Sequence, residues 1–386
     1  MKKGILLLGL IFSCVLSLVC FPGAVSAASA KEKPGVAATS AKGDWKAKWE
    51  KILSEARKEG RVVVYGPPVA EARQGFIDNF QKAYPGITVD YLGMKGSETA
   101  GKLAGERRGG LYLVDLYIGG TTTVLSSIRE FFQPIKPLLI RPDVLDGKVW
   151  LGGKVDFADT EGKLLIAFSV SANSNVAYNT NLVKAGEITS YWDLTKPKYK
   201  GKIIYHDPRA AGKGLATATF WYKNPQLGLE YIRALAANKP VLTRDHRNQA
   251  ESVARGKYAI ALATETATRR FVMTPGVPME MTSLLKEGSY NTTGSWAVTL
   301  LDKPPNPNAA AVFLNWLLSQ EGQTVMSVRG SVASRRLDVP TDHLHWAERI
   351  DVEAYNKGLY QDNYKEIIVM EKDTLSPHLK EIFADF

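Results

Sequence analysis

The sequence predicts an α/β fold built on mostly parallel sheets, and two observations indicate it. Short apolar segments rich in β-branched residues alternate with segments whose apolar residues recur at helical spacing. This alternation is typical of parallel strands joined by right-handed helical crossovers. The chain is also long enough, at 386 residues, to form two lobes of ordinary domain size.

The first residues have the pattern of a secretory signal peptide. Residues 2–3 are both lysine, residues 4–21 are almost wholly apolar, and small residues follow at once. This order predicts a signal peptide over residues 1–27 and a protein exported to the periplasm. We expect cleavage after Ala27, with Ala30 as the second choice.

Both cysteines, Cys14 and Cys20, lie inside this segment. The mature chain would therefore contain no disulfide and would depend on its core alone. A lipid anchor on Cys20 is the alternative. Val19 stands where a lipid-attachment motif needs a small residue, so the cleaved form is preferred.

The formal net charge is +10, yet the basic residues are scattered and do not form a run of five. A basic surplus favours anionic partners in general. Because the export signal argues against nucleic acid, we interpret the charge as solvated surface with a preference for anionic ligands.

Helices and strands can be assigned in order along the chain. A polar leader over residues 28–43 is expected to be disordered, and residues 341–386 form a mixed tail with expected helices near 346–356 and 363–371. The expected strands are 61–65, 87–91, 113–118, 164–169, 202–205, 258–263 and 279–284, and the expected helices are 44–59, 70–84, 226–237, 246–255 and 308–318. Loops 66–69, 94–98 and 119–122 follow three of these strands. Ligands of parallel sheets lie beyond the carboxyl ends of the strands.

Residues 196–222 contain the clearest candidate binding feature. A short strand ends at Asp207-Pro208, and a loop of small residues leads into a helix that begins at about Leu215. The first N–H groups of a helix are available to an anion, and Arg209 adds a planar cation suited to carboxylate or phosphate. The alternative is an ordinary strand–loop–helix connection with a solvated arginine.

Residues 58–340 resemble the extracellular solute-binding proteins of ABC importers, in particular the branch that includes the ferric-ion-binding proteins. The resemblance depends on the exported start and on four segments. These are Val62–Tyr65 with its following helix, Phe80-x-x-x-Tyr84-Pro85-Gly86-Ile87, Val176–Val183, and Trp192–Ile203 with Asp207-Pro208. The helix over 309–320 is a further match.

The resemblance implies a two-lobed, Venus-flytrap fold of the type II periplasmic binding proteins, with a mostly parallel sheet in each lobe. Lobe 1 would comprise residues 44–168 and 285–340, and lobe 2 residues 169–284. The chain would cross between them near 168–172 and 284–294. It also implies a monomer that closes on a small-molecule ligand and docks on the membrane subunits of an ABC permease.

If the resemblance holds, ten residues are expected to converge on the cleft between the lobes. Their hydroxyl, amide and guanidinium groups suit a small organic anion. They are Pro67, Ser97, Thr121, Thr122, Ser171, Asn173, Arg209, Gly212, Thr264 and Glu265. Ser, Thr and Asn are also favoured in turns and caps, and Glu265 would instead pair with a cationic ligand or with Arg209. Tyr65, Tyr117 and Trp221 could flank a ligand, but core packing is the alternative that we prefer.

We interpret the chain as a binding protein without catalytic activity, cofactor or bound metal. The ferric-binding members have two adjacent tyrosines after the strand that corresponds to 258–263, whereas this chain has Thr264-Glu265-Thr266. A ferric-ion carrier therefore remains the alternative within the family. An exported enzyme on the same fold, using Glu265 and Asp115, and a ligand sensor are the alternatives from other classes. No metalloprotease, serine-hydrolase or P-loop motif is present.

Overall fold

A computed structural model describes residues 41–173, 176–264 and 266–386, with backbone alone at 41–44, 173 and 266. The predicted signal peptide over 1–27 and nearly all of the predicted leader lie outside these residues. The first described helix, α1 (Ala41–Glu59), begins three residues before its predicted start. Gly43–Phe386 forms one compact unit.

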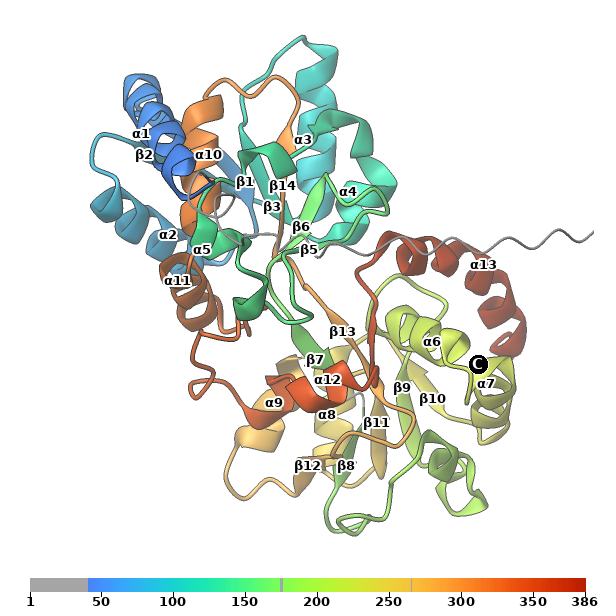
Figure 1. Ribbon diagram of the computed structural model, residues 1–386. Coiled ribbons are helices and arrows are strands. Elements are labelled where there is room, and N and C mark those ends of the chain that lie inside the picture. Colours follow the sequence, from blue (N-terminus) through green and yellow to red (C-terminus); the bar gives the residue numbers. More distant parts are fainter. Residues whose placement is uncertain (1–40, 174–175, 265) are drawn as a thin grey trace, which may run out of the picture. The chain divides into compact units, whose positions relative to one another are not determined.

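The first lobe contains a seven-stranded sheet whose main order is β2-β1-β3-β14-β6-β5, with β4 paired to β14 (Figure 1). Its strands are β1 (Arg61–Gly66), β2 (Thr88–Gly93), β3 (Leu116–Gly119), β4 (Phe132–Gln133), β5 (Asp156–Phe157), β6 (Leu165–Ala167) and β14 (Ala297–Leu301). β1, β2 and β3 pair in parallel, and the remaining pairs are antiparallel. Since only β14 and β5 run against the others, five of the seven strands share one direction.

Helices cover both faces of this sheet, because its strands alternate their side chains between the faces. Val62, Val64 and Ile118 pack with helices α1, α2 and α10, whereas Tyr65 and Tyr117 pack with α3 and α4 on the other face. The helices of this lobe are α2 (Ala70–Ala83), α3 (Gly96–Arg108), α4 (Thr121–Ser127), α5 (Pro142–Leu145), α10 (Pro307–Leu317) and α11 (Gln320–Gly330).

The second lobe contains a five-stranded sheet in the order β10-β9-β11-β8-β12. Its strands are β8 (Val176–Asn179), β9 (Ile203–His206), β10 (Val241–Thr243), β11 (Ile260–Leu262) and β12 (Met279–Met281). β10, β9 and β11 are parallel, and the two following pairs are antiparallel. The helices are α6 (Lys213–Lys223), α7 (Gly228–Ala237), α8 (His246–Ala254) and α9 (Thr266–Met273). Tyr191, Trp221 and Tyr231 form the aromatic centre of this core, with ring centroids 5.1–6.0 Å apart.

A separate three-stranded sheet joins the two lobes. It has the order β15-β13-β7, with β7 (Ser171–Asn173), β13 (Ser289–Thr292) and β15 (Tyr360–Asp362). β13 pairs antiparallel to β7 and parallel to β15. β7 and β13 overlap the segments 168–172 and 284–294, and β15 adds a strand from the C-terminal tail.

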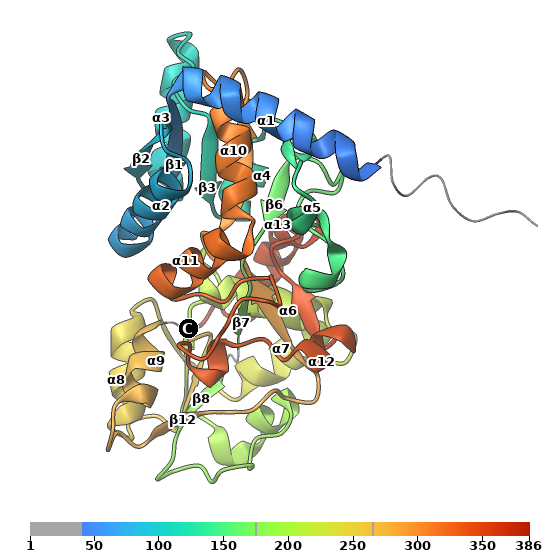
Figure 2. The ribbon, with the colours of Figure 1, turned by 60° about the vertical axis from the view of Figure 1, so that its left-hand side comes forward.

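The tail also contributes helices α12 (Val352–Asn356) and α13 (Glu366–Ile382). Helix α13 contacts α4 of the first lobe and α6 and α7 of the second (Figures 1 and 2). The tail is therefore packed into the fold on both sides of the connecting sheet. Six short 3-10 helices complete the described elements: Arg129–Phe131, Lys136–Leu138, Gly147–Val149, Tyr191–Thr195, Pro197–Tyr199 and Trp346–Glu348.

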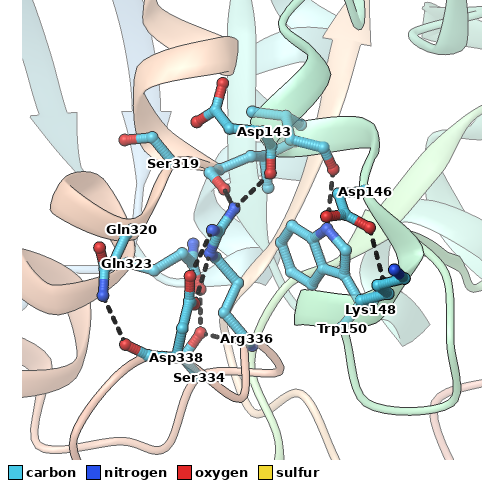
Figure 3. Close-up of polar contacts among 12 residues, drawn as sticks. Asp143, Asp146, Lys148, Trp150, Ser319, Gln320, Gln323, Ser334, Arg336 and Asp338 are labelled. Carbon is cyan, nitrogen blue, oxygen red and sulfur yellow. Dashed lines mark hydrogen bonds and ion pairs between the residues drawn. The ribbon is translucent and has the colours of Figure 1, made fainter.

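The segment that leads from α11 to the tail is fixed by Arg336 (Figure 3). Its guanidinium is almost fully buried and donates to the carbonyls of Asp143 at 3.0 Å and Leu318 at 3.1 Å. It also pairs with Asp338 at 2.7 Å. Because each of its three nitrogens donates to an oxygen and Asp338 supplies the opposite charge, this buried cation is compensated. It ties the segment to α5 and to the end of α10.

Four of the predicted strands are shorter in the structure, namely 113–118, 164–169, 258–263 and 279–284. The apolar run 113–118 predicts a strand, but β3 begins only at Leu116, and Leu113 is 47% exposed. Asp115 instead accepts hydrogen bonds from Val63 N at 2.7 Å and from Asn306 N and Nδ2. The predicted strand 279–284 is likewise shortened to Met279–Met281.

Candidate functional site

A pocket of about 320 Å³ lies where the two lobes and the tail meet. In the first lobe, Gly120 between β3 and α4 lines the pocket, together with Thr121 and Thr122 in the first turn of α4. The start of α6 in the second lobe provides Gly212, Lys213 and Ala216. The remaining lining residues are Thr292 at the end of β13, Thr293 and Gly294 after it, and Asn363, Tyr364 and Lys372 of the tail.

The first-lobe wall of the pocket follows from the parallel register of its strands. β1 pairs in register with β2 and β3, so the loops that follow all three strands lie at one edge of the sheet. Tyr91 OH, on β2, donates to Pro67 O at 3.2 Å, in the loop that follows β1. Gly96 lies so close to Thr123 that a Cβ there would approach its Oγ1 to 2.4 Å.

The second-lobe wall is the first turn of α6. Gly212 precedes this helix with φ 140°, which side chains other than glycine rarely permit. Gly214 lies so near β9 that a Cβ would approach His206 O to 2.2 Å. These two glycines let the helix begin directly over the end of β9. Its first N–H groups have no partner within the helix and give the pocket a positive electrostatic potential.

The pocket is cationic. Lys213 and Lys372 line it, and its described lining residues include no aspartate or glutamate. Lys372 Nζ donates to Thr122 Oγ1 at 3.3 Å. Burial lowers the pKa of Lys372, with a smaller opposing effect from Asp373, because the surrounding protein disfavours the charged ammonium.

Two tail residues are held in place at the pocket by contacts to both lobes. Asn363 Nδ2 donates to Ala216 O at 2.9 Å, on α6. Tyr364 is buried and its hydroxyl donates to Asp156 of the first-lobe sheet. Burial raises the pKa of Tyr364 well above its usual value, so the phenol stays neutral and donates this hydrogen bond.

Three of the ten residues expected in the cleft line this pocket: Thr121, Thr122 and Gly212. Ser171 lies beside it, since its backbone pairs with Thr292 in the connecting sheet. Pro67 lies in the loop after β1 and Ser97 in the first turn of α3, and neither lines the pocket.

Thr264, Asn173 and Glu265 complete the expected set. Thr264 is buried at the carboxyl end of β11, the same edge of the sheet at which β9 ends, and it does not line the pocket. The side chain of Asn173 and all of Glu265 lie outside the described residues.

Arg209 does not line the pocket, and its guanidinium is engaged elsewhere. It pairs with Asp207 at 2.9 Å and donates to the main-chain oxygens of Phe383 at 2.7 Å and Phe386 at 3.1 Å. Burial disfavours the Asp207 carboxylate, but hydrogen bonds from Arg209 and Arg244 outweigh it and hold its pKa below the usual value. The expected solvated or ligand-facing arginine is instead a clamp on the C-terminal segment, and the cations at the pocket are lysines.

Five further lining residues were not expected from the sequence: Lys213, Thr292, Thr293, Asn363 and Lys372. Lys213 could have been found, because it stands next to Gly212 at the start of the predicted helix. The tail residues had no comparable signal, since the resemblance ends near residue 340 and nothing local shows that a distant helix folds back onto the site.

The aromatic residues considered as flanks of a ligand lie in the cores instead. Tyr65 and Tyr117 belong to the first-lobe core, and Trp221 belongs to the second. Asp115, one of the two acids considered for an enzyme, precedes β3, whereas Gly120 of the pocket follows its carboxyl end. Burial raises the pKa of Asp115, and hydrogen bonds from Val63 and Asn306 oppose that rise.

Within residues 41–173, 176–264 and 266–386, no three side chains among His, Cys, Asp and Glu gather closely enough to hold a metal ion. None of the helices described here combines the length and the apolar character needed to cross a bilayer.

Comparisons with known proteins place the chain in a family. The family model described as bacterial extracellular solute-binding protein matches residues 75–347. An uncharacterized protein of Haemophilus influenzae is 24% identical over 291 residues, which cover 72% of this chain and 79% of that protein.

Two solved structures show the same fold. The periplasmic binding protein AfuA of Actinobacillus pleuropneumoniae, with fructose-6-phosphate bound, has a TM-score of 0.60 at 18% identity, over 85% of this chain and 99% of that one. The Trichodesmium protein IdiA (FutA), in complex with iron and citrate, has a TM-score of 0.62 at 18% identity, over 84% of this chain and 98% of that one. These likenesses confirm the two-lobed α/β fold. The chain belongs to the bacterial extracellular solute-binding proteins, the binding components of ABC importers.

Proposed function

We propose that this protein captures a small organic anion in the pocket between its lobes and delivers it to an ABC permease. The observation that carries the proposal is the composition of the pocket wall. Two lysines and the start of α6 face a space whose described lining has no acidic residue. An anion would neutralise this positive charge in a partly desolvated site, where electrostatic interactions are stronger than in water.

The size and polarity of the pocket narrow the class of solute. A space of about 320 Å³ is at the small end of ligand sites. The hydroxyls of Thr121, Thr122, Thr292 and Thr293 can donate to anion oxygens and accept from hydroxyls of a ligand body. A carboxylate, phosphonate or phosphate on a short polar skeleton suits this combination. Fructose-6-phosphate and citrate, found with the two structural relatives, both have this character.

A thermal-shift screen of the chain from residue 28 onward tests the proposal. The panel comprises citrate, inorganic phosphate, small phosphonates and fructose 6-phosphate, with fructose, thiamine and ferric chloride as comparisons. A ligand that binds only the folded state raises its stability by about 2.7 kcal/mol at a hundred times its Kd. We expect a shift with an anion and none with fructose, and the shift should shrink as salt is added.

The outcomes separate the candidate functions. A shift with ferric salts alone would replace the organic anion by iron as the cargo. A shift with thiamine alone would mean that acidic groups outside the described residues determine the charge of the site. A panel without any shift would overturn the proposed solute class.

A further inference from the structure

Helix α13 connects the two lobes and passes beside the pocket on its way. Near its start, Val369 packs in the first-lobe core with α3 and α4. Further along, Leu375 and Leu379 are completely buried in the second-lobe core with α6 and α7, and Phe383 follows them there. Figures 1 and 2 both show the helix alongside α6.

Lys372 lies between these two anchored stretches. Its neighbour Glu371 pairs with Lys223 at 3.0 Å, on α6, whereas Lys372 reaches the first-lobe residue Thr122. This lysine lines the pocket and forms no ion pair with any carboxylate in the described part of the chain. Its ammonium has lost part of its water without gaining a described counter-ion, an arrangement that is costly for a charge.

Asn363 and Tyr364, the other tail residues that line the pocket, carry no charge that could pair with Lys372 or with a ligand. Asn363 uses its amide nitrogen on Ala216 and its amide oxygen on Gln361 Nε2, at 2.6 Å. Tyr364 uses its hydroxyl on Asp156. Both side chains therefore fix the tail in position. Lys372 is the tail residue that has a charge to offer a ligand.

We propose that Lys372 is a ligand-binding residue, and that its ammonium forms an ion pair with the anionic group of the solute. The proposal rests on the function proposed above. It adds the C-terminal helix to the two lobes as a third contributor to binding. An anion near Thr122 would meet Lys372 Nζ from one side and the start of α6 from the other, so that α13 is held by the occupied pocket as well as by the cores.

A purely structural role for Lys372 can be distinguished from ligand binding by whether its charge matters. If Lys372 only braces α13 against α4, the bond to Thr122 matters and the charge does not. Lys372→Gln retains a donor and removes the charge, and Lys372→Arg retains both. Lys380→Gln is the matched control, because Lys380 is exposed on the same helix and does not line the pocket.

The experiment measures the Kd of each variant by calorimetry, with citrate, inorganic phosphate and fructose 6-phosphate as probes, together with the Tm of the free protein. We expect Lys372→Gln to raise the Kd of the bound anion at least tenfold and to weaken its salt dependence. Lys372→Arg should restore binding to within about threefold, and Lys380→Gln should leave it unchanged.

Failure of this inference can be told from failure of the proposed function. Anion binding that is equal in wild type and Lys372→Gln overturns the role of Lys372 and leaves the proposed function standing. A wild-type protein that binds none of the anions overturns both. If the Lys372→Gln protein does not fold, Lys372→Met replaces it, because methionine keeps much of the side-chain length without the charge. A Kd that rises at least tenfold in Lys372→Met supports the direct contact, and an unchanged Kd overturns it.

Discussion

At the scale of single residues, Arg209 shows how a surface arginine becomes part of the architecture. Its guanidinium bonds to Asp207 on one side and to main-chain oxygens of Phe383 and Phe386 on the other. Asp207 is only 3% exposed, so its charge depends on the two arginines beside it. The clamp joins the end of β9 to the end of α13.

We predict that Arg209→Ala destabilises the protein and leaves anion binding nearly unchanged. The substitution removes one partner of a buried carboxylate and two donors to the C-terminal segment, which should lower the free energy of unfolding by about 1–3 kcal/mol. Urea denaturation measures this loss, and calorimetry with citrate or fructose 6-phosphate measures binding.

Arg247→Ala is the matched control for this prediction. Its side chain is 83% exposed and pairs with Glu251 at 2.8 Å, and exposed pairs of this kind contribute less than about 1 kcal/mol. Equal stability of the two variants would contradict the clamp. A loss of anion binding in Arg209→Ala at unchanged stability would make Arg209 a ligand residue after all.

Long-range contacts of single residues are what the sequence could not predict. The pattern around 207–214 correctly indicates a strand, a small-residue loop and a helix start, because those depend on local chemistry. The main-chain oxygens of Phe383 and Phe386 that Arg209 contacts lie more than 170 positions away in the sequence, and no local pattern indicates them. Gly212 could be predicted because a local pattern, a small-residue loop before a helix, indicates it. Lys372 could not, because its place at the pocket depends on contacts with residues far away in the sequence.

At the scale of elements, the parallel strands with their helices were predictable, and the tail was not. β1, β2, β9 and β11 fall within one or two residues of their predicted positions, since a β-branched run bounded by glycine or proline is a strong signal. The tail helix α13 is longer than predicted, beginning three residues late and extending to Ile382. It contains Pro377, which disfavours a helix interior, and its buried side chains find their partners only in the folded molecule.

We predict that α13 is an integral part of the second-lobe core. Leu379 is fully buried there, so Leu379→Ala should lower the free energy of unfolding by about 2–5 kcal/mol, through lost burial and the cavity it leaves. Urea denaturation followed by tryptophan fluorescence measures the change.

Ile367→Ala on the same helix provides the comparison. This side chain is 63% exposed, and an exposed substitution of this kind should change the free energy of unfolding by less than about 0.5 kcal/mol. If the two variants have the same stability, α13 is only loosely attached and cannot position Lys372.

At the scale of the whole molecule, the pocket depends on three parts that have separate anchors. The start of α4 follows strand β3 of the first-lobe sheet, the start of α6 follows β9 of the second-lobe sheet, and α13 packs in both cores. A solute that contacts all three stabilises the arrangement in which they are close, which is how ligand contacts from both lobes drive hinge closure.

Hydrogen–deuterium exchange should therefore show simultaneous protection in all three parts. On addition of a bound anion, we expect slower exchange in peptides that cover residues 119–123, 212–216 and 369–373, because local opening must then also break ligand contacts. Residues 256–259 precede β11 at the opposite, amino end of the strands, and their exchange should stay unchanged. Protection confined to 212–216 would indicate a ligand held by one lobe. Protection of both lobes without 369–373 would keep the interlobe pocket and remove α13 from it, since a helix that senses the solute must exchange more slowly when the solute is bound.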